Sequence, residues 1–184
     1  MSLDPADAQS VLSSVVSTED GHSLDFRVPY VDDGLAWADW VMAVAPATRM
    51  FDPVLAIGED IRRPIPPACG FVRLRLAHYS LDLESGPDAE QYMQRHGLYA
   101  ASPYHMLALV QHVPDIRKAI DHIRRRGPGL FATDPVQADG CADQAVGMWF
   151  GGADTPGRTQ VMSYKEILGE LTYFIFARDH WLTD

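Results

Sequence analysis

Cysteine, long apolar runs and basic residues are all scarce in this sequence. Only Cys69 and Cys141 occur, and their spacing fits neither a zinc knuckle nor a redox pair, so we expect reduced, buried or half-exposed thiols rather than a disulfide. No apolar run reaches the roughly 18 residues of a membrane-spanning helix, so none is predicted. The 15 Lys and Arg residues face 25 Asp and Glu residues, and the net charge of −10 disfavours nucleic acid and anionic membranes as partners.

No secretory signal is visible either, because the first residues show no basic segment followed by an apolar block. We therefore expect a soluble, cytoplasmic protein. The 184 residues are 47% hydrophobic, which is enough to bury a core as one domain or as two fused half-domains. No Walker loop, Rossmann fingerprint, H-E-x-x-H motif or nucleophile elbow appears. The usual motifs of nucleotide binding and hydrolysis thus give no guide to function.

A weak internal repeat is the most informative positive feature. His22 is followed ten residues later by Asp32, and His105 is followed ten residues later by Asp115. An apolar stretch separates each His from its Asp, and a helical pattern follows each Asp. The offset of 83 residues between the two histidines indicates two copies of one module. The predicted division is an N-terminal arm over residues 1–20, a first module with its linker over 21–97, and a second module over 98–184.

The predicted elements of the first module come from apolar periodicity. Apolar residues alternate with charged ones from Leu24 to Val31 and from Phe71 to Leu83, which predicts strands. Between them, an apolar stripe at helical spacing follows the N-cap candidates Asp32 and Asp33 and predicts a helix that Pro46 closes. The stripe consists of Trp37, Trp40, Val41 and Val44, and a further strand is expected over Met50–Gly58.

The second module shows a similar order of elements. A short helix over Asp88–His96 precedes it, and Tyr104–Val113 has the apolar character of a strand. Pro114 then suits the first turn of a helix that ends at Gly127. The apolar stripe of this helix is Ile116, Ala119, Ile120 and Ile123, and later strands are expected over Leu130–Val136, Ala145–Phe150 and Leu171–Ala177.

The second module resembles the vicinal oxygen chelate superfamily, which includes glyoxalases, extradiol dioxygenases, hydroxyphenylpyruvate dioxygenases and metal-free antibiotic-binding proteins. The resemblance rests on Tyr104–Leu109, Pro114–Ile116, Ala119-Ile120 and Arg126-Gly127, and on Thr172–Arg178, which is similar to the last strand of hydroxyphenylpyruvate dioxygenases. It implies an α+β fold in which two βαβββ modules form curled mixed sheets around a cavity. It also implies a small-molecule ligand and makes a homodimer a reasonable expectation.

The resemblance further implies a divalent metal, iron, manganese, zinc or nickel, held between the modules. Position by position, His22 and His105 match the ligands of the two opening strands, Glu84 matches the closing carboxylate of the first module, and Glu170 is the uncertain fourth ligand. Two imidazoles and a carboxylate leave open positions for substrate and for water or dioxygen. The implied function is a glyoxalase- or dioxygenase-like enzyme, a dioxygenase or a lyase/isomerase, that acts on a small oxygenated molecule. Phe174 departs from the pattern, because the family places a Glu ligand there.

Three alternatives stay open. His22 also fits an ordinary turn residue, and Glu84 fits a solvated charge at a strand end. The chain also fits a metal-free small-molecule-binding protein of the same fold, and an unrelated α+β fold such as a ferredoxin-like dimer. In the metal-free alternative an aromatic cavity replaces the metal, although core packing explains its residues equally well. The predicted cavity residues are Trp149, Tyr173, Phe174 and Phe176.

Overall fold

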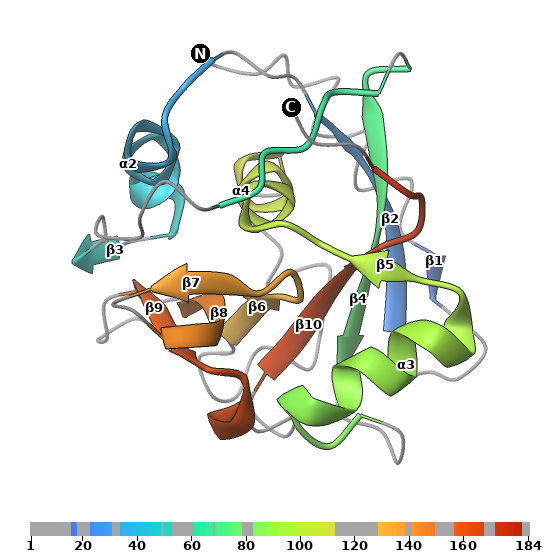
Figure 1. The fold of residues 1–184 in the computed structure, drawn as a ribbon. Coiled ribbons are helices and arrows are strands. Elements are labelled where there is room, and N and C mark those ends of the chain that lie inside the picture. The colour runs from blue at the N-terminus through green and yellow to red at the C-terminus, as the bar shows by residue number, and fades with distance from the viewer. Residues whose placement is uncertain are drawn as a thin grey trace.

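In the computed structural model of the chain, one open sheet carries helices on both faces (Figure 1). The structure describes residues 16–17, 23–30, 34–48, 50–52, 61–67, 69–78, 83–112, 129–138, 141–149, 157–167 and 172–181. The elements are β1 (Val16–Ser17), β2 (Ser23–Pro29), α2 (Trp37–Thr48), β3 (Met50–Asp52), β4 (Phe71–His78), the 3-10 turn η1 (Gly86–Asp88), α3 (Ala89–His96), β5 (Tyr99–Ala100), α4 (Pro103–His112), β6 (Gly129–Ala132), β7 (Val136–Ala138), β8 (Cys141–Trp149), β9 (Gly157–Ser163), the 3-10 turn η3 (Tyr164–Glu166) and β10 (Thr172–Ala177).

The sheet runs in the order β1-β2-β4-β10-β6-β8-β9-β3, with the short strands β5 and β7 paired to β10 and β8. β10 pairs with β6 and β3 pairs with β9 in parallel, and the other pairings are antiparallel. The prediction of a mixed α and β fold is therefore confirmed. Strands from both halves of the chain share this one sheet, and the predicted division into two βαβββ modules is not confirmed.

Strand β10 forms the centre of the sheet, and all six of its residues are buried. Tyr173, Ile175 and Ala177 face the core that α2 and α4 cover, whereas Phe174 and Phe176 face the core that α3 covers. This division follows from the strand pleat, which sends successive side chains to opposite faces. A strand buried on both faces must be apolar at every position, and the run Tyr-Phe-Ile-Phe-Ala meets that requirement.

Helix α4 corrects the strand predicted over Tyr104–Val113. The segment is helical from Pro103 to His112 and is buried around its whole circumference between α2 and the sheet. Ser102 begins it, because its Oγ accepts from Tyr104 N at 3.3 Å, and Pro103 suits the first turn. A helix buried on every side shows no amphipathic period, so a short apolar run of this kind reads equally well as a strand.

Most of the other predicted elements that fall on described residues are confirmed with shifted ends. The helix after Asp33 is α2, and it continues past Pro46 to Thr48. No helix in the described segments is long and apolar enough to span a membrane. Cys69 and Cys141 are free thiols, but both are exposed rather than buried or half-exposed as predicted. The arm before residue 16, the helix predicted from Pro114 to Gly127 and residues 53–60 lie outside the described residues. The confirmed strands are β2, β4, β6, β8 and β10, and the short helix expected over Asp88–His96 is α3.

Candidate functional site

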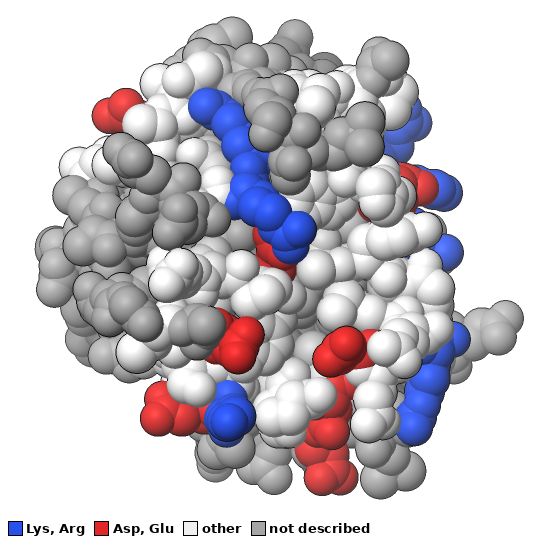
Figure 2. Space-filling model, viewed as in Figure 1, with Lys and Arg blue, Asp and Glu red and all other residues white. Residues whose placement is uncertain are grey.

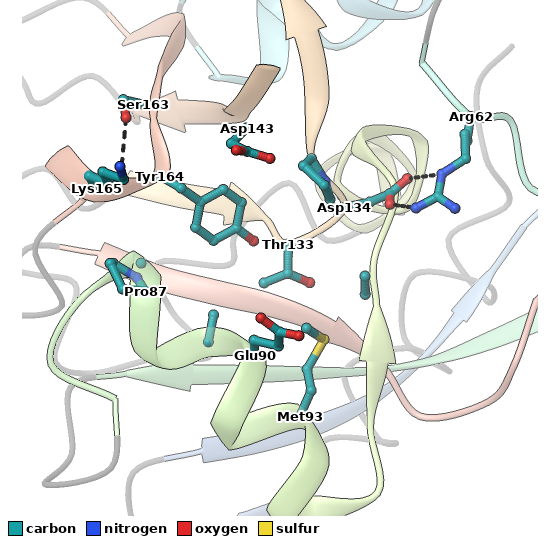
Figure 3. Close-up of a pocket in the computed structure, with 14 residues that line it drawn as sticks. Arg62, Pro87, Glu90, Met93, Thr133, Asp134, Asp143, Ser163, Tyr164 and Lys165 are labelled. Atoms are coloured by element: carbon teal, nitrogen blue, oxygen red, sulfur yellow. Dashed lines mark hydrogen bonds and ion pairs between the residues drawn. The ribbon is translucent and has the colours of Figure 1, made fainter. Parts of the chain in front are cut away.

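A cavity of about 660 Å³ opens beside α3, on the face shown in Figures 1 and 2. Ligand sites of small molecules commonly have volumes of about 300–1,000 Å³. Acidic and basic side chains gather around the middle of this face (Figure 2). The lining comes from η1, α3, the loop after β6, the bend in β8 and η3, and its polar members are Arg62, Glu90, Thr133, Asp134, Asp143, Ser163, Tyr164 and Lys165 (Figure 3).

Tyr164 lies along the cavity wall because two turns approach each other closely. Gly86 of η1 donates its N–H to Ile167 O at 3.1 Å, and a Cβ atom at Gly86 would lie 2.0 Å from the carbonyl oxygen of Tyr164. Only glycine fits this contact without a backbone shift. At the start of η3, Ser163 Oγ accepts from Lys165 N at 3.3 Å, which fixes the turn. The tight packing of η1 on η3 therefore places the Tyr164 ring beside the cavity (Figure 3).

The hydroxyl of Tyr164 is a buried polar group without a hydrogen-bond partner among the described residues. Burial raises the pKa of this hydroxyl above its ordinary value of 10.0, because the phenolate would lose its solvation. The group therefore stays protonated at neutral pH and is available as a hydrogen-bond donor. A buried donor without an acceptor is costly, and such groups often mark a place where a ligand or water binds.

Two carboxylates turn toward the cavity without an ion-pair partner in the described part of the chain. Glu90 lies in the first turn of α3, and Asp143 lies in β8 (Figure 3). The β7–β8 register shifts here, with Val136 opposite Gln144 and Ala138 opposite Cys141. Asp143 lies within this irregularity and has a φ of 59°, a conformation that Asp tolerates better than most residues. The irregularity thus directs a charged side chain out of the regular pleat and toward the cavity.

The third carboxylate of the lining, Asp134, is already paired. Arg62 Nε donates to Asp134 Oδ2 at 3.0 Å, and a second guanidinium nitrogen contacts Oδ1. Asp134 N also donates to Ala101 O at 3.0 Å. The neighbouring Thr133 Oγ1 donates to Ile175 O at 2.6 Å and accepts from Ala101 N at 2.9 Å. Thr133 and Asp134 therefore form a rigid floor, whereas Glu90 and Asp143 remain available to a ligand.

His105 is buried in α4, and its position there corrects the predicted role of a strand ligand. Its Nδ1 accepts from Ser102 N at 3.1 Å, and its Nε2 has no hydrogen-bond partner among the described residues. Burial lowers the pKa of the imidazole from 6.5 to about 3, so the ring is neutral at physiological pH. Because Nδ1 accepts a hydrogen bond, the single ring proton lies on Nε2. A protonated Nε2 has no lone pair to offer a metal.

The four predicted metal ligands are not brought together in the described part of the structure. Glu84 is exposed just before η1, and His22 and Glu170 lie outside the described residues. No group of three His, Cys, Asp or Glu side chains within the described segments could hold a metal ion. The divalent metal that the resemblance implied stays a prediction, because two of its four candidate ligands lie outside the described residues.

The predicted aromatic cavity is filled with packed side chains. Phe174 and Phe176 lie in the core under α3, and Tyr173 lies in the core under α4. Trp149 packs edge-on against Phe131, with ring centroids 6.0 Å apart. None of the four predicted residues is among those that line the cavity beside α3. Their packing in the described structure agrees with the core-packing alternative.

The residues that do line the cavity were not singled out from the sequence. One local signal was available, because Ser85 and Asp88 have the spacing of a capping box, and Asp88 Oδ2 accepts from Ser85 N at 2.9 Å. That signal locates the start of α3 and hence Glu90. Nothing local indicates that Asp143 and Tyr164 face the same space.

Comparisons of the chain with protein-family models, curated proteins and solved structures found no match. The resemblance to the vicinal oxygen chelate superfamily accordingly stays a prediction from the sequence.

Proposed function

We propose that this protein binds a small organic molecule bearing an ammonium group in the cavity beside α3, without a metal. The observation that carries the proposal is the buried, unpartnered hydroxyl of Tyr164 beside a cavity with two unpaired carboxylates, Glu90 and Asp143. An amine placed between these carboxylates gains charge-assisted hydrogen bonds. An acceptor atom on the same molecule accepts a hydrogen bond from the Tyr164 hydroxyl.

The charge of the lining supports a cationic ligand. Three carboxylates and two basic side chains line the cavity, and the Arg62–Asp134 pair leaves Glu90 and Asp143 against Lys165. The net charge of −10 for the whole chain adds a long-range attraction for cations. Since the carboxylates of Glu90 and Asp143 belong to exposed residues, salt screens them, and affinity is expected to fall as ionic strength rises.

Binding, rather than proton transfer by Tyr164, is the role its surroundings favour. A hydroxyl whose pKa is raised by burial is a poor base at neutral pH and a good neutral donor. Thr133 beside it has both its hydrogen bonds committed to the backbone, so the floor is preorganised. A rigid floor with a few fixed polar groups is the usual arrangement of a selective small-molecule site.

The test is a ligand-observed NMR screen of aromatic and aliphatic amines, each paired with its N-acetyl derivative. Amines are expected to bind, and their N-acetyl partners to bind at least roughly tenfold more weakly. The double variant Glu90→Gln/Asp143→Asn should lose roughly tenfold in affinity, since it removes both charges. Glu166→Gln is the matched control, because Glu166 is an exposed carboxylate in η3, beside Tyr164 in sequence, and does not line the cavity. Equal binding of each amine and its amide would refute the proposal.

The metal-dependent glyoxalase- or dioxygenase-like enzyme stays a prediction of the sequence, as do the two-module arrangement and the homodimer. The prediction of a metal-dependent enzyme depended on two equivalent opening strands that carry His22 and His105. His105 lies on a helix instead, and β2 begins only after His22. We therefore favour the metal-free alternative, with the site moved from the predicted aromatic cavity to the cavity beside α3.

A further inference from the structure

A second, smaller cavity of about 440 Å³ lies over α4, and it plays no part in the function proposed above. Its walls are largely apolar and include Ile65, Pro66, Phe71 and Trp181. His105 also lines this cavity, although its side chain is fully buried. The cavity thus combines an apolar body with one polar side chain that the fold leaves incompletely satisfied.

The proton on His105 Nε2 is fixed by the backbone. Ser102 N donates to Nδ1, so the neutral ring must carry its proton on Nε2. The rings of Tyr30 and Trp181 lie beside the imidazole at centroid distances of 5.6 and 5.2 Å, and Nε2 has no hydrogen-bond partner among the described residues. The desolvation cost of an unpaired donor is then uncompensated in the free protein. Nε2 itself has no accessible surface in the free protein, so an acceptor that enters the cavity would remove that cost once the side chains covering Nε2 move aside.

We propose that this cavity is a second binding site, for a neutral apolar or aromatic molecule whose single carbonyl oxygen accepts the proton of His105 Nε2. The apolar walls supply most of the binding energy, and the imidazole supplies the orientation. A metal ion is a poor alternative, because its coordination would require the ring to release Nε2–H and to give up the hydrogen bond from Ser102 N.

The charges at the rim favour a neutral molecule over an ion. Arg73 Nε donates to Asp179 Oδ2 at 2.7 Å, so the two charged residues of the lining neutralise each other. His180, the remaining titratable ring of the rim, is exposed, and the thiol of Cys69 donates to Phe71 O at 3.3 Å. A charged ligand would have to break the Arg73–Asp179 pair, whereas a neutral carbonyl compound leaves it intact.

Trp181 gives the site its own optical reporter. Its indole Nε1 donates to Ala100 O at 2.6 Å, and its ring meets His105 at an interplanar angle of 79°. The same indole lies under the Arg62 guanidinium, at 5.5 Å from its ring centroid. A molecule in the smaller cavity would contact Trp181 directly, so its binding should change the fluorescence of this residue.

The test compares two probes of nearly equal shape, 2-acetylnaphthalene and 2-ethylnaphthalene, by Trp181 fluorescence in the full chain, with Trp181→Phe identifying the signal. The acetyl compound is expected to bind roughly tenfold more tightly, because only it can accept from Nε2. The His105→Asn variant, which keeps an acceptor for Ser102 N, should bind both probes equally. Ile65→Ala should weaken both probes by the same factor and keep the tenfold preference.

NMR of the histidine ring nitrogens in the unmodified protein makes the test independent of any variant. The acetyl probe should shift the Nε2 resonance of His105, and the ethyl probe should leave it nearly unchanged. Three results would each overturn the proposal: equal affinities for the two probes, no binding of either probe, or an Nε2 resonance that does not shift when the acetyl probe is added. The last outcome would mean that the contact with Trp181 already satisfies the imidazole. Amines that bind in the cavity beside α3 should not displace the probe from the smaller cavity. Each of the two binding proposals can therefore be refuted without affecting the other.

Discussion

His105 should make the protein lose stability as the pH falls from neutral toward pH 5. Its pKa is lowered from 6.5 to about 3 in the folded state by burial alone. Between these two values the unfolded chain binds a proton that the folded chain does not bind, so the free energy of unfolding falls with falling pH in this window. Below pH 3 both states are protonated, and above pH 6.5 neither is, so the effect is confined to the window.

The size of the effect follows from the two pKa values. Between about pH 7.5 and pH 5 the unfolded state gains about 2 kcal/mol from protonation of this one ring, and the full effect approaches about 5 kcal/mol near pH 3. The imidazole is fully buried, so solvent screening does not reduce this figure in the way it would for a surface group. An effect of 2 kcal/mol is a large part of the stability of an ordinary domain.

Urea unfolding at pH 7.5, 6 and 5 would measure this effect, with His105→Asn as the variant that cannot titrate. The carboxylates titrate in both proteins, so the difference between the two free energies of unfolding reports on the His105 ring alone. The variant is expected to be less stable at pH 7.5, and the gap should narrow by about 2 kcal/mol at pH 5. His96→Asn serves as the matched substitution at an exposed histidine, at the end of α3. A constant gap for His105→Asn would refute the reasoning.

Three further predictions concern the packing of the sheet and the cavity wall. Gly147→Ala should lower the free energy of unfolding by about 1–3 kcal/mol in urea, because the new Cβ would lie 2.2 Å from the buried ring of Phe131; unchanged stability would contradict this contact. Gly86→Ala should cost at least as much and weaken amine binding in calorimetry, since its Cβ would meet the backbone of Tyr164; full affinity would argue that this packing does not shape the site. Tyr164→Phe should leave stability unchanged or raise it by up to about 1 kcal/mol while weakening ligand binding, and a marked loss of stability would reveal a partner for the hydroxyl.

Local patterns predicted much of the sheet and the helices α2 and α3. The alternation Leu74, Leu76 against Arg73, Arg75 identified β4, because one side of this strand is buried and the other carries ion pairs with Asp25 and Asp179. The same logic failed for α4, where burial on every side removes the period that separates a helix from a strand. Ser102 and Pro103 begin this helix in the structure, and the strand prediction made no use of them as a start signal.

The site was less predictable than the fold, because it is assembled from distant segments. Glu90, Asp143 and Tyr164 come from α3, an irregularity in β8 and a turn after β9, and each is unremarkable in its local sequence. His105 was selected as a metal ligand at a strand start, whereas its significance in the structure comes from burial and from a proton that Ser102 holds on Nε2. Such properties arise from tertiary contacts, and a single sequence does not encode them in any local pattern.

The central position of β10 has a consequence for the synthesis of the protein. The strand that joins β4 to β6 is the last of the described strands to leave the ribosome, after β2, β4, β6, β8 and β9 have all been translated. Until residues 172–177 emerge, the growing chain carries two separate groups of strands whose inner edges lack their partner. Unpaired edges of this kind attract other chains. The sheet therefore cannot close until residues 172–177 have been translated, so its closure is a late step among the described strands.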